Sequence, residues 1–457
     1  MNTIKTFAIN TLGCKVNQYE TQQIRELLGR FGLIETDNIP SAELLIVNTC
    51  CVTQSASAKS RQAVRKFQKQ NPNATIIVAG CLPALSGSEL ANLSGNIRLI
   101  GNRSNLAPTI AQITGRCCEK KCSSKTYKTV GETIKPQTAE EIKHKINLSA
   151  EDTFSQLPPI TAFSGHSRAF LKIQDGCDAR CTYCIIPQIR KNVCNKNVKT
   201  IISEAKALIA SGHREIVLTG VFLGAYGQNT ARRKKWDTTK NDRLAALLDD
   251  LAGIDGLERL RLSSLEPADV SEKLLDIFCK HDNIAPHLHL PLQSGSEKIL
   301  KKMCRQYTAA DFRATVAKIK ARLDRPAITA DIIVGFPGET DEDFADTVQM
   351  AEDCGFAKMH IFPFSSRENT AAAKMAPKVK SEIIKERSKL LHNLDKKLAK
   401  KFRCQFAGEK VSIIVEDTDP LQGRCSRYFM VKLPKTEIDE TIQKGDLICT
   451  KLGKKGV

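Results

Sequence analysis

The chain has 457 residues, with 69 Lys or Arg against 50 Asp or Glu and a formal net charge of +19. This length exceeds one ordinary hydrophobic core and predicts two or three domains. An apolar content of 41% is enough for globular packing. The first residues lack the apolar core of a signal peptide, and no run of about 18 apolar residues occurs. We therefore expect a cytoplasmic protein that does not enter a membrane.

Charge and cysteine content narrow the class of function. A basic excess of this size favours a polyanionic partner such as a nucleic acid. Seventeen cysteines in a long chain without a secretion signal argue against a disulfide framework. We expect some of these cysteines to bind metal and the rest to be buried as small apolar residues.

The N-terminal part alternates strand and helix patterns, which predicts βα units around a parallel sheet. Strands are expected at 5–9, 44–47 and 75–78, and helices at 17–31 and 55–70.

Each of the three expected N-terminal strands runs into a cysteine: Cys14, Cys50 and Cys81. Ligands of an open parallel sheet bind outside the carboxyl ends of its strands, so the fold would bring these thiols to one edge. The sequence therefore predicts a three-cysteine metal site. Cys51 is a possible ligand in place of Cys50, although the strand register favours Cys50. Three incidental thiols are the alternative.

Residues 116–165 are expected to form a linker, because they are polar and carry runs of Lys and Glu. Cys117, Cys118 and Cys122 lie in this segment. They are either exposed thiols or a further metal site, and the charged surroundings favour exposed thiols.

From residue 168 onward, six strand patterns alternate with helical patterns, which predicts a partial parallel (β/α)6 barrel with an open side. The strands are expected at 169–173, 215–219, 260–263, 287–290, 328–334 and 359–362. Helices are expected at 201–210, 244–251, 270–278, 309–323 and 343–351, the last with a capping box between Thr340 and Asp343.

Three cysteines follow the first barrel strand in the stretch DGCDARCTYCIIP: Cys177, Cys181 and Cys184. Iron–sulfur clusters normally take four cysteines, so a compact triplet predicts a four-iron cluster with one iron open to a small molecule. A structural zinc site is the alternative, but such sites close with four ligands and no second cysteine pair follows nearby. The nearest further thiol is Cys194 in a basic run.

The C-terminal part begins with a basic helix and ends in strands. Residues 378–403 hold ten Lys or Arg and three Asp or Glu, and form either a solvated linker helix or one that faces nucleic acid. Its expected buried stripe is Ile383, Arg387, Leu390, Leu394 and Leu398. Beyond residue 404, short strands at 411–415, 428–433 and 446–450 predict a small all-β module.

These motifs together resemble a known family. DGCDARCTYCIIP resembles the signature of radical S-adenosylmethionine (SAM) enzymes, and LGCKVNQYE, NTC and AGC resemble the N-terminal domain of the methylthiotransferases. VLTGVFLGAYG, RLSSLEP, HLPLQSGS and DIIVGFPGET resemble the barrel strands of that family, and the tail resembles its RNA-binding TRAM module. The resemblance covers nearly the whole chain.

The resemblance implies an enzyme of three domains. They are an N-terminal parallel-sheet domain at 1–115, a radical SAM barrel with the basic helix at 166–400, and a TRAM-like small barrel at 401–457. A linker at 116–165 joins the first two. The cofactors of this enzyme would be two [4Fe–4S] clusters and SAM. Cys177, Cys181 and Cys184 would hold one cluster, and Cys14, Cys50 and Cys81 the other.

Within the family, GCKVNQYE and QDGCDARCTYCIIP most resemble the branch that methylthiolates C2 of N6-threonylcarbamoyladenosine beside the anticodon of tRNA. A related reaction on isopentenyladenosine tRNA or on a ribosomal protein is the first alternative. A non-catalytic metal-binding RNA protein is the second. The electron donor has no signature in the sequence, and no catalytic residue beyond the cluster ligands is assigned.

Polar groups and glycines at strand ends are the candidates for binding SAM. The methionyl end is assigned to Thr219 and Gly220, the ribose to Gln293, Ser294 and Asp331, and the close approach of adenine to Gly335 and Gly338. The alternative for each is a residue that only forms a turn. Glu266 either pairs with a cationic group of SAM or forms a salt bridge at the barrel rim. The strand histidines His287, His289 and His360 receive no role.

Two basic segments are candidates for binding tRNA. The first is 232–236, where four cations would contact phosphates and Trp236 would stack on a base, or else the segment is a solvated loop. The second lies in the β module at Arg424, Arg427 and Lys432.

Overall fold

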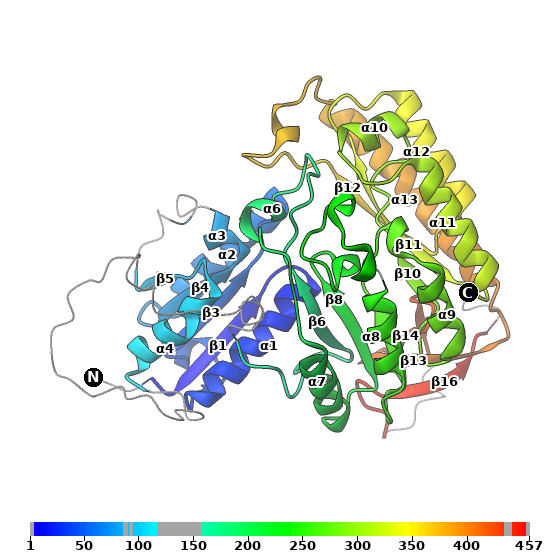
Figure 1. Cartoon of the computed structure of the whole chain (residues 1–457). Helices are drawn as coiled ribbons and strands as arrows, with labels where there is room; N and C mark the ends of the chain where they lie inside the picture. The colour runs from blue at the N-terminus through cyan, green and yellow to red at the C-terminus, as the bar shows by residue number, and fades with distance from the viewer. Residues whose placement is uncertain are drawn as a thin grey trace.

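The computed structural model describes residues 4–85, 90, 95–116, 157–240, 242–433 and 441–453. Cys117, Cys118 and Cys122 lie outside these residues, so their role stays a prediction. The described chain forms an N-terminal α/β layer structure, a central barrel and a C-terminal β module (Figure 1).

The N-terminal sheet is parallel throughout, as predicted, with strand order β2-β1-β3-β4-β5. Helix α2 covers one face through Val64 and Phe67, while α1 and α4 cover the other through Leu28 and Ile110. The short strands β2 and β5 and helix α4 were not predicted from the sequence. The elements are β1 Thr6–Thr11, α1 Lys15–Arg30, β2 Ile34–Glu35, β3 Leu44–Thr49, α2 Gln54–Gln70, β4 Thr75–Gly80, α3 Cys81–Leu85, β5 Ile97–Leu99 and α4 Leu106–Thr114.

The predicted six-stranded partial barrel is confirmed. Its strands run parallel in the order β6, β8, β9, β10, β11 and β12, with the isolated bridges Leu260–Ile284 and Ser264–His289 joining the two halves. The short strand β7 (Cys194–Asn195) pairs antiparallel with β6 outside this series. The strand bounds are β6 Ala169–Asp175, β8 Glu215–Gly220, β9 Arg259–Leu262, β10 His287–His289, β11 Ala327–Val334 and β12 Lys358–Pro363.

Helices cover the outside of the barrel and bury its largest apolar cluster. The capping box at the start of α12 is present, with the Thr340 and Asp343 side chains each accepting from the other's backbone amide. The covering helices are α7 Val198–Ala210, α8 Arg243–Ala252, α9 Glu272–Lys280, α10 Glu297–Lys302, α11 Ala309–Arg322 and α12 Asp341–Cys354. The short helix α6, Ile186–Ile189, instead packs against α3 of the N-terminal unit.

The basic helix is α13, Ser381–Cys404, and its predicted buried face is partly wrong. Arg387 and Leu398 are buried as expected, but Ile383 is 36% exposed and Leu390 is 52% exposed. Leu391 and Asp395 are buried in place of Leu390 and Leu394, and the buried face continues to Phe402. The reason is that α13 packs against strand β12, where Asp395 accepts from the Met359 amide. It is therefore part of the barrel wall, with its basic side outward.

Helix α1 lies between the N-terminal sheet and the barrel (Figure 1). It packs against β6 and β8, and Tyr19 donates a hydrogen bond of 2.6 Å to Glu204 of α7. The N-terminal unit therefore covers the side on which the six-stranded barrel is open.

The C-terminal module is a four-stranded antiparallel sheet in the order β15-β14-β13-β16, which includes one strand, β14, that the sequence did not predict. It contacts the amino-terminal edge of the barrel, where Arg261 of β9 donates to the carbonyl of Ser426. The strands are β13 Lys410–Thr418, β14 Leu421–Cys425, β15 Met430–Lys432 and β16 Leu447–Lys451.

None of the described helices is both long and apolar enough to cross a membrane.

Candidate metal centres at the domain interface

The first cysteine triplet lies on a tight loop that leaves strand β6. Gly176 has φ +77°, and a Cβ there would lie 1.8 Å from the Asn192 carbonyl oxygen, so only glycine fits. The loop is closed by the Cys177 amide, which donates to the Arg190 carbonyl at 2.9 Å, and by the Cys184 amide, which donates to the Cys181 carbonyl at 3.1 Å. These bonds hold the three cysteines together at the carboxyl edge of the barrel.

The thiols of this loop interact electrostatically. Burial is the main cause that raises the pKa of Cys177 to about 12, and the neighbouring Cys181 and Cys184 raise it further. The pKa of Cys184 is also raised to about 12 by burial and then by Cys181. Thiolates are stable in such a place only when a cation balances them, which is the condition that a metal ligand set meets.

Arg305, which sequence reasoning missed, supplies a cation beside this triplet. Its Nη1 donates to Cys181 Sγ at 3.2 Å and to the Tyr183 hydroxyl at 3.2 Å. Its Nη2 pairs with Glu266, so the rim salt bridge considered for Glu266 is present. The other oxygen, Glu266 Oε2, is buried without a hydrogen-bond partner. It is therefore still available to a cationic group of a ligand.

The second triplet is assembled from three separate strand ends, as predicted. Cys14 caps the start of α1, Cys50 follows β3, and Cys81 begins α3 after β4. Burial raises the pKa of Cys50 to about 11, and the nearby Cys81 and Cys14 raise it further. A Cβ on Gly13 would lie 3.0 Å from Cys50 Sγ, so glycine lets the chain before Cys14 pass close to that sulfur.

Cys50 and Cys51 lie in different surroundings. Cys51 is fully buried in the apolar cluster under α2, and its Sγ donates to the Cys81 carbonyl at 3.4 Å. Cys50 instead turns toward Gly13 and the other two cysteines. The Cys51 thiol also interacts with the Cys81 thiol, so the choice of Cys50 over Cys51 as the ligand stays a prediction. No cysteine among the described residues forms a disulfide.

The two triplets lie on either side of the interface between the N-terminal unit and the barrel, and one short barrel segment links them. Ile185, the residue after Cys184, packs in the same apolar cluster as Cys81 and Leu82. Arg190, six residues after Cys184, donates to Cys81 Sγ at 3.6 Å. One short segment of the barrel thus holds the last cysteine of its own loop and contacts a cysteine of the other set.

A buried ion network fixes this interface. Arg190 pairs with Glu20 of α1 at 2.8 Å and with Asp175 of β6 at 2.9 Å. Lys172 and Arg103 each pair with the same two carboxylates. Burial alone would raise the pKa of Glu20, but the three cations outweigh it and hold that pKa at about 2. Three cations face two carboxylates here, so one positive charge is left beside Cys81.

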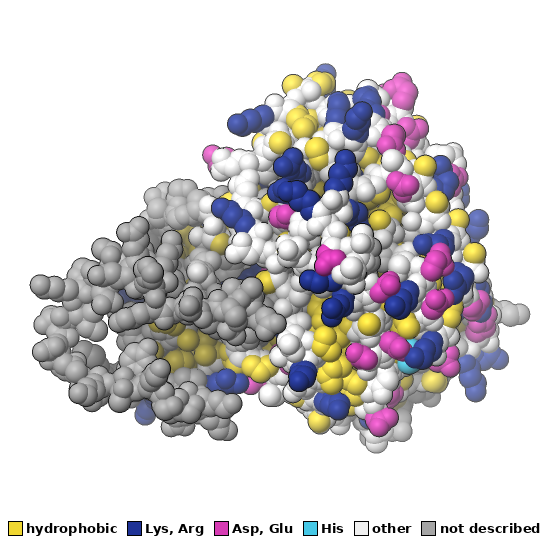
Figure 2. Space-filling view, in the orientation of Figure 1, with side chains coloured by type: hydrophobic (Ala, Val, Ile, Leu, Met, Phe, Trp, Pro, Cys, Tyr) yellow, Lys and Arg dark blue, Asp and Glu magenta, His cyan; other side chains and the backbone are white. Residues whose placement is uncertain are grey.

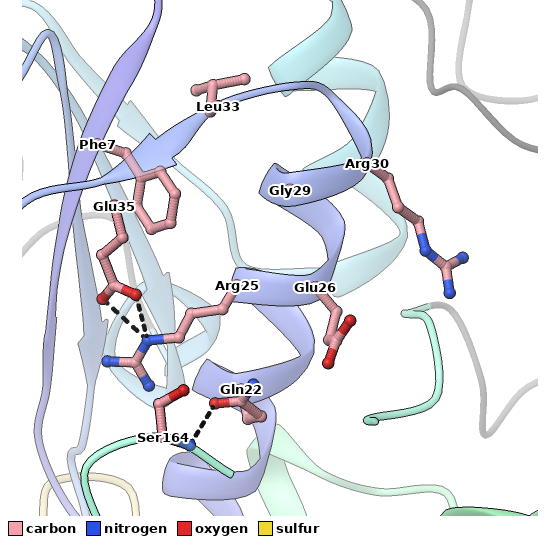
Figure 3. A pocket seen from close by; sticks show the side chains of 9 residues that line it. All are labelled: Phe7, Gln22, Arg25, Glu26, Gly29, Arg30, Leu33, Glu35 and Ser164. Carbon is pink, nitrogen blue, oxygen red and sulfur yellow. Dashed lines mark hydrogen bonds and ion pairs between the residues drawn. The ribbon is translucent and has the colours of Figure 1, made fainter. Parts of the chain in front are cut away.

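Two hollows lie near this interface. A cavity of about 520 Å³ runs between the units and is lined by Cys81, Arg103, Arg190 and Cys194 among others. Another hollow lies on the outer side of α1, where Arg25 pairs with Glu35 and Gln22 accepts from the Ser164 amide (Figure 3). No cysteine lines this second hollow among the residues described there.

Two family models match the chain. Residues 6–101 match the model described as uncharacterized protein family UPF0004, and residues 171–351 match the radical SAM superfamily. A protein of Bacillus subtilis (strain 168), named threonylcarbamoyladenosine tRNA methylthiotransferase MtaB, is 34% identical over 440 residues, which cover 94% of this chain and 91% of the relative. A Chlamydia pneumoniae protein of the same name is 36% identical over 426 residues, covering 93% and 90%.

The chain belongs to the MtaB family of radical SAM methylthiotransferases. It is also 30% identical over 469 residues to an Agrobacterium fabrum protein named tRNA-2-methylthio-N(6)-dimethylallyladenosine synthase, covering 100% of this chain and 96% of the relative. The solved structure of the radical SAM methyltransferase TsrM from Kitasatospora setae, with cobalamin and a [4Fe–4S] cluster bound, has a TM-score of 0.52 at 15% identity, covering 79% of this chain and 72% of TsrM. That likeness shows a shared fold.

The cofactors of this family are two [4Fe–4S] clusters and SAM. The described residues fit them, because each triplet supplies three free thiols and an arginine lies against one sulfur of each.

The residues predicted to bind SAM lie at the carboxyl edge of the barrel, except Asp331, which lies within β11 and 3.3 Å from His289 Nε2. Two of the edge residues have close neighbours of their own. Gly335 faces helix α13, because a Cβ there would lie 2.4 Å from Ile384. Ser294 is fully buried, 3.3 Å from the Thr347 hydroxyl. Gln293 has φ +63° and its amide donates to the Asp331 carbonyl. The assignment of these residues, with Thr219, Gly220 and Gly338, to SAM stays a prediction.

Polar side chains lie together inside the barrel, although the sequence analysis gave His289 and His360 no role and assigned Asp331 to SAM. His289 Nδ1 lies 2.9 Å from the Thr329 hydroxyl, and His289 Nε2 lies 3.3 Å from Asp331 Oδ2. One ligand atom each of His289, Asp331 and His360 lies within 4.8 Å of the others. The signal was present, because these residues occupy every second position of β10, β11 and β12, the face opposite the apolar cluster.

The basic residues predicted to bind tRNA differ in whether they already have partners within the fold. Arg232 pairs with Asp178 at 3.2 Å and Arg233 with Asp269 at 2.7 Å, and Arg233 also covers the Trp236 ring. In the β module, Arg424 pairs with Glu416 and Arg427 with Asp324. These arginines therefore stabilise local structure. The exposed cations are Lys234, Lys235 and Lys432, together with Arg180 and Lys191 beside the first triplet, which were not predicted.

Proposed function

We propose that this chain transfers a methylthio group to C2 of N6-threonylcarbamoyladenosine in the anticodon loop of tRNA. The names of its most similar relatives support this substrate, and the radical SAM model that matches the barrel supports the chemistry. The observation that carries the proposal is the barrel segment that links the two triplets, with Ile185 in the same apolar cluster as Cys81 and Arg190 against Cys81 Sγ. A methylthio transfer needs both centres next to one substrate atom.

We assign the ligands as the sequence analysis did. Cys177, Cys181 and Cys184 would hold the cluster beside which SAM binds, while Cys14, Cys50 and Cys81 would hold the other. When bound, these groups supply a carbon radical, the sulfur and the methyl group. Thr219, Gly220, Gln293, Ser294, Asp331, Gly335 and Gly338 are the proposed contacts to SAM.

The chain itself binds and orients the cofactors and the substrate, and it shields them from water. Arg305 and Arg190 each place a guanidinium at one cysteine sulfur, which offsets the negative charge of a thiolate cluster. Glu266 Oε2, buried and unpartnered, faces the first centre and suits the amino group of SAM. The ion network around Glu20 joins α1 to the barrel and so fixes the position of one centre relative to the other.

Binding of tRNA is proposed to be electrostatic first and base-specific second. Figure 2 shows Lys and Arg side chains over the upper part of the molecule, the side on which α6 follows the cysteine loop. Arg180, Lys191, Lys234 and Lys235 are exposed around that loop and its neighbour. A loop adenosine can be unstacked into the barrel mouth, as readers of single-stranded RNA require. The β module is proposed to be the TRAM-like RNA contact.

The remaining parts of the proposal concern organisation and setting. We propose the domains 1–115, 166–400 and 401–457 with a linker at 116–165. We also propose a cytoplasmic setting, where tRNA is available, and an electron donor whose identity the chain does not encode.

Two measurements test the proposal. In a deletion strain, methylthio-threonylcarbamoyladenosine should disappear from tRNA nucleosides and return with the wild-type gene. If this nucleoside persisted and another methylthio product vanished, the substrate assignment would be wrong. In anaerobically reconstituted protein, the Cys177/Cys181/Cys184→Ala variant should keep about four of about eight irons. Zinc in place of iron would overturn the chemistry.

A further inference from the structure

The side chains of β10, β11 and β12 alternate between the covering helices and the interior of the barrel. Leu288, Ile332 and Met359, one on each strand, are buried in the apolar cluster under those helices. Successive side chains of a strand point to opposite faces, so the residues on either side of these three face inward. The inward residues form three layers between the amino-terminal edge and the mouth at the carboxyl edge.

The exposed fractions of these side chains show where the interior is open. In the lowest layer, Thr329 is fully buried and His287 is 3% exposed, so this layer is closed. In the middle layer, the side chains of His289 and Asp331 are 14% and 28% exposed. Phe362, in the top layer, is 45% exposed although it faces inward. An inward side chain is exposed only where the interior is unfilled, so an open space runs from the mouth down to the middle layer.

His360 is the third member of the middle layer and the one without a hydrogen bond. His289 uses Nδ1 toward the Thr329 hydroxyl at 2.9 Å and Nε2 toward Asp331 Oδ2 at 3.3 Å, so both of its nitrogens are engaged. In the described parts of the chain, neither ring nitrogen of His360 makes a hydrogen bond. Burial lowers the pKa of His360, although Asp331 raises it, so the ring is neutral at pH 7. It offers one N–H donor and one acceptor to the open space.

The mouth at the end of β12 lies beside both sets of cysteines. Tyr183 of the first cysteine loop packs in one apolar cluster with Ile333, which is paired with Phe362 in the top layer. Gln54, four residues after Cys50 of the second set, donates through its backbone amide to Ser365 Oγ at 3.1 Å, just beyond β12. A base that is held at the level of the top layer therefore has one centre on each side.

The reaction brings the N6 arm of the target adenosine into this open space. In adenine, C2 and C6 are both bonded to N1, so a base that presents C2 to the centres carries its N6 arm beside them. The threonylcarbamoyl arm spans about five bonds from N6 to its hydroxyl, or about 6 Å. His360 precedes Phe362 by two residues of β12, which is about 7 Å along the strand. The arm of a base at the level of Phe362 therefore reaches the middle layer and ends there.

We propose that His360 is a specificity-determining residue, which hydrogen-bonds the hydroxyl of the amino-acid arm on the target adenosine. This inference rests on the proposed function and adds the recognition of the arm to it. A hydroxyl can donate to a neutral imidazole or accept from it, whereas an isopentenyl arm can do neither and would leave His360 without a partner. Asp331 has a carboxylate oxygen within 4.8 Å of the His360 ring nitrogen, so like charge directs the carboxylate of the arm back toward the mouth. Asp331 uses Oδ2 for His289, and its Oδ1 stays open to the ribose of SAM.

The test compares three anticodon stem-loop RNAs that differ only in the N6 arm. One carries the threonylcarbamoyl arm, one carries 2-aminobutyrate in place of threonine and so lacks only the hydroxyl, and one carries an isopentenyl arm. Affinity and single-turnover methylthiolation are measured for wild type, His360→Gln and His360→Leu. His213→Leu is the matched control, because His213 is also half-buried but precedes β8 at the opposite edge of the barrel. Metal content and RNA-free SAM cleavage establish that each variant retains its clusters.

Wild type and His213→Leu should prefer the threonylcarbamoyl RNA over the 2-aminobutyrate RNA by about tenfold, the usual effect of one buried hydrogen bond left unmade. His360→Leu should lose this preference and bind the isopentenyl RNA more tightly than wild type does, while His360→Gln, which keeps a donor and an acceptor, should retain most of the preference. No preference in wild type, or an unchanged one in His360→Leu, would overturn the inference.

The same measurements separate two other outcomes. One further divalent metal ion per chain that is lost in His360→Leu would overturn the inference, because the middle layer would then be a metal site. Absence of methylthio product from the threonylcarbamoyl RNA in wild type, with the affinity preference intact, would instead contradict the proposed function alone.

Discussion

The two cysteine triplets are built in opposite ways. Cys177, Cys181 and Cys184 lie on one loop, and backbone hydrogen bonds within that loop hold them together. Cys14, Cys50 and Cys81 come from three strand ends and meet only because the sheet is parallel. The first set needs a local turn, whereas the second needs a folded domain. Each set nonetheless has one arginine against one sulfur.

The largest expected effect separates the first centre from the second. Cys177→Ala should reduce SAM cleavage to background, measured as 5′-deoxyadenosine formation, because two thiolates cannot hold the cluster that binds SAM. Cys194→Ala is the control, since Cys194 lies nearby on β7 and has no ligand role. Equal loss of cleavage in the control would show that the loop is simply fragile.

The second prediction tests the fold-assembled centre through two adjacent cysteines. Cys50→Ala should abolish methylthio transfer while SAM cleavage continues, since only the second centre loses a ligand. Cys51→Ala should retain both activities and lose about 1 kcal/mol of stability, because it removes one buried sulfur. Product analysis and thermal unfolding of both variants show which of the two cysteines is the ligand. The opposite pattern would make Cys51 the ligand.

The third prediction compares the two arginines. Arg305→Met should lower SAM cleavage about tenfold to hundredfold, the usual cost of losing a group that supports a metal ligand. Arg190→Met should leave RNA-free cleavage close to wild type, lower methylthio transfer by a similar factor, and destabilise the fold by about 3–5 kcal/mol, because it breaks a buried ion network. If both variants lost the same activity, the two centres would not have separate supports.

The smallest effect is a stability control away from both triplets. Leu391→Ala should cost about 2–5 kcal/mol of unfolding free energy, because Leu391 is fully buried on the packed face of α13. Leu390→Ala should change it by less than about 0.5 kcal/mol, because Leu390 is 52% exposed. Neither should alter iron content. If urea unfolding gave the same loss of free energy for both variants, the buried face of α13 described here would be wrong.

Most helices and strands could be predicted from the sequence. The predictions failed for features that depend on contacts between segments far apart in the chain. Alternating strand and helix patterns predicted the parallel N-terminal sheet and the six barrel strands, because local periodicity marks these elements. It missed β14 and shifted the face of α13, because both depend on which surface each segment packs against. In α13, Leu390 and Leu391 are equally apolar, and only contact with β12 determines which is buried.

The candidate sites divide in the same way. The spacing of Cys177, Cys181 and Cys184 is readable without any structure, and the strand-end rule predicts the other set. The partners of these cysteines are not readable, since Arg190 and Arg305 lie among 69 cations with no local mark. Arg424 and Arg427 show the converse error, because basic residues predicted to bind tRNA are paired within the fold.

The account depends most on the closeness of the two centres, and magnetic coupling between them tests it directly. In reduced, reconstituted protein, electron paramagnetic resonance should show spin–spin broadening between the clusters. The broadening should vanish when either triplet is replaced by alanine, while the remaining cluster keeps its own signal. A wild-type spectrum equal to the sum of the two single-cluster spectra would contradict the shared interface.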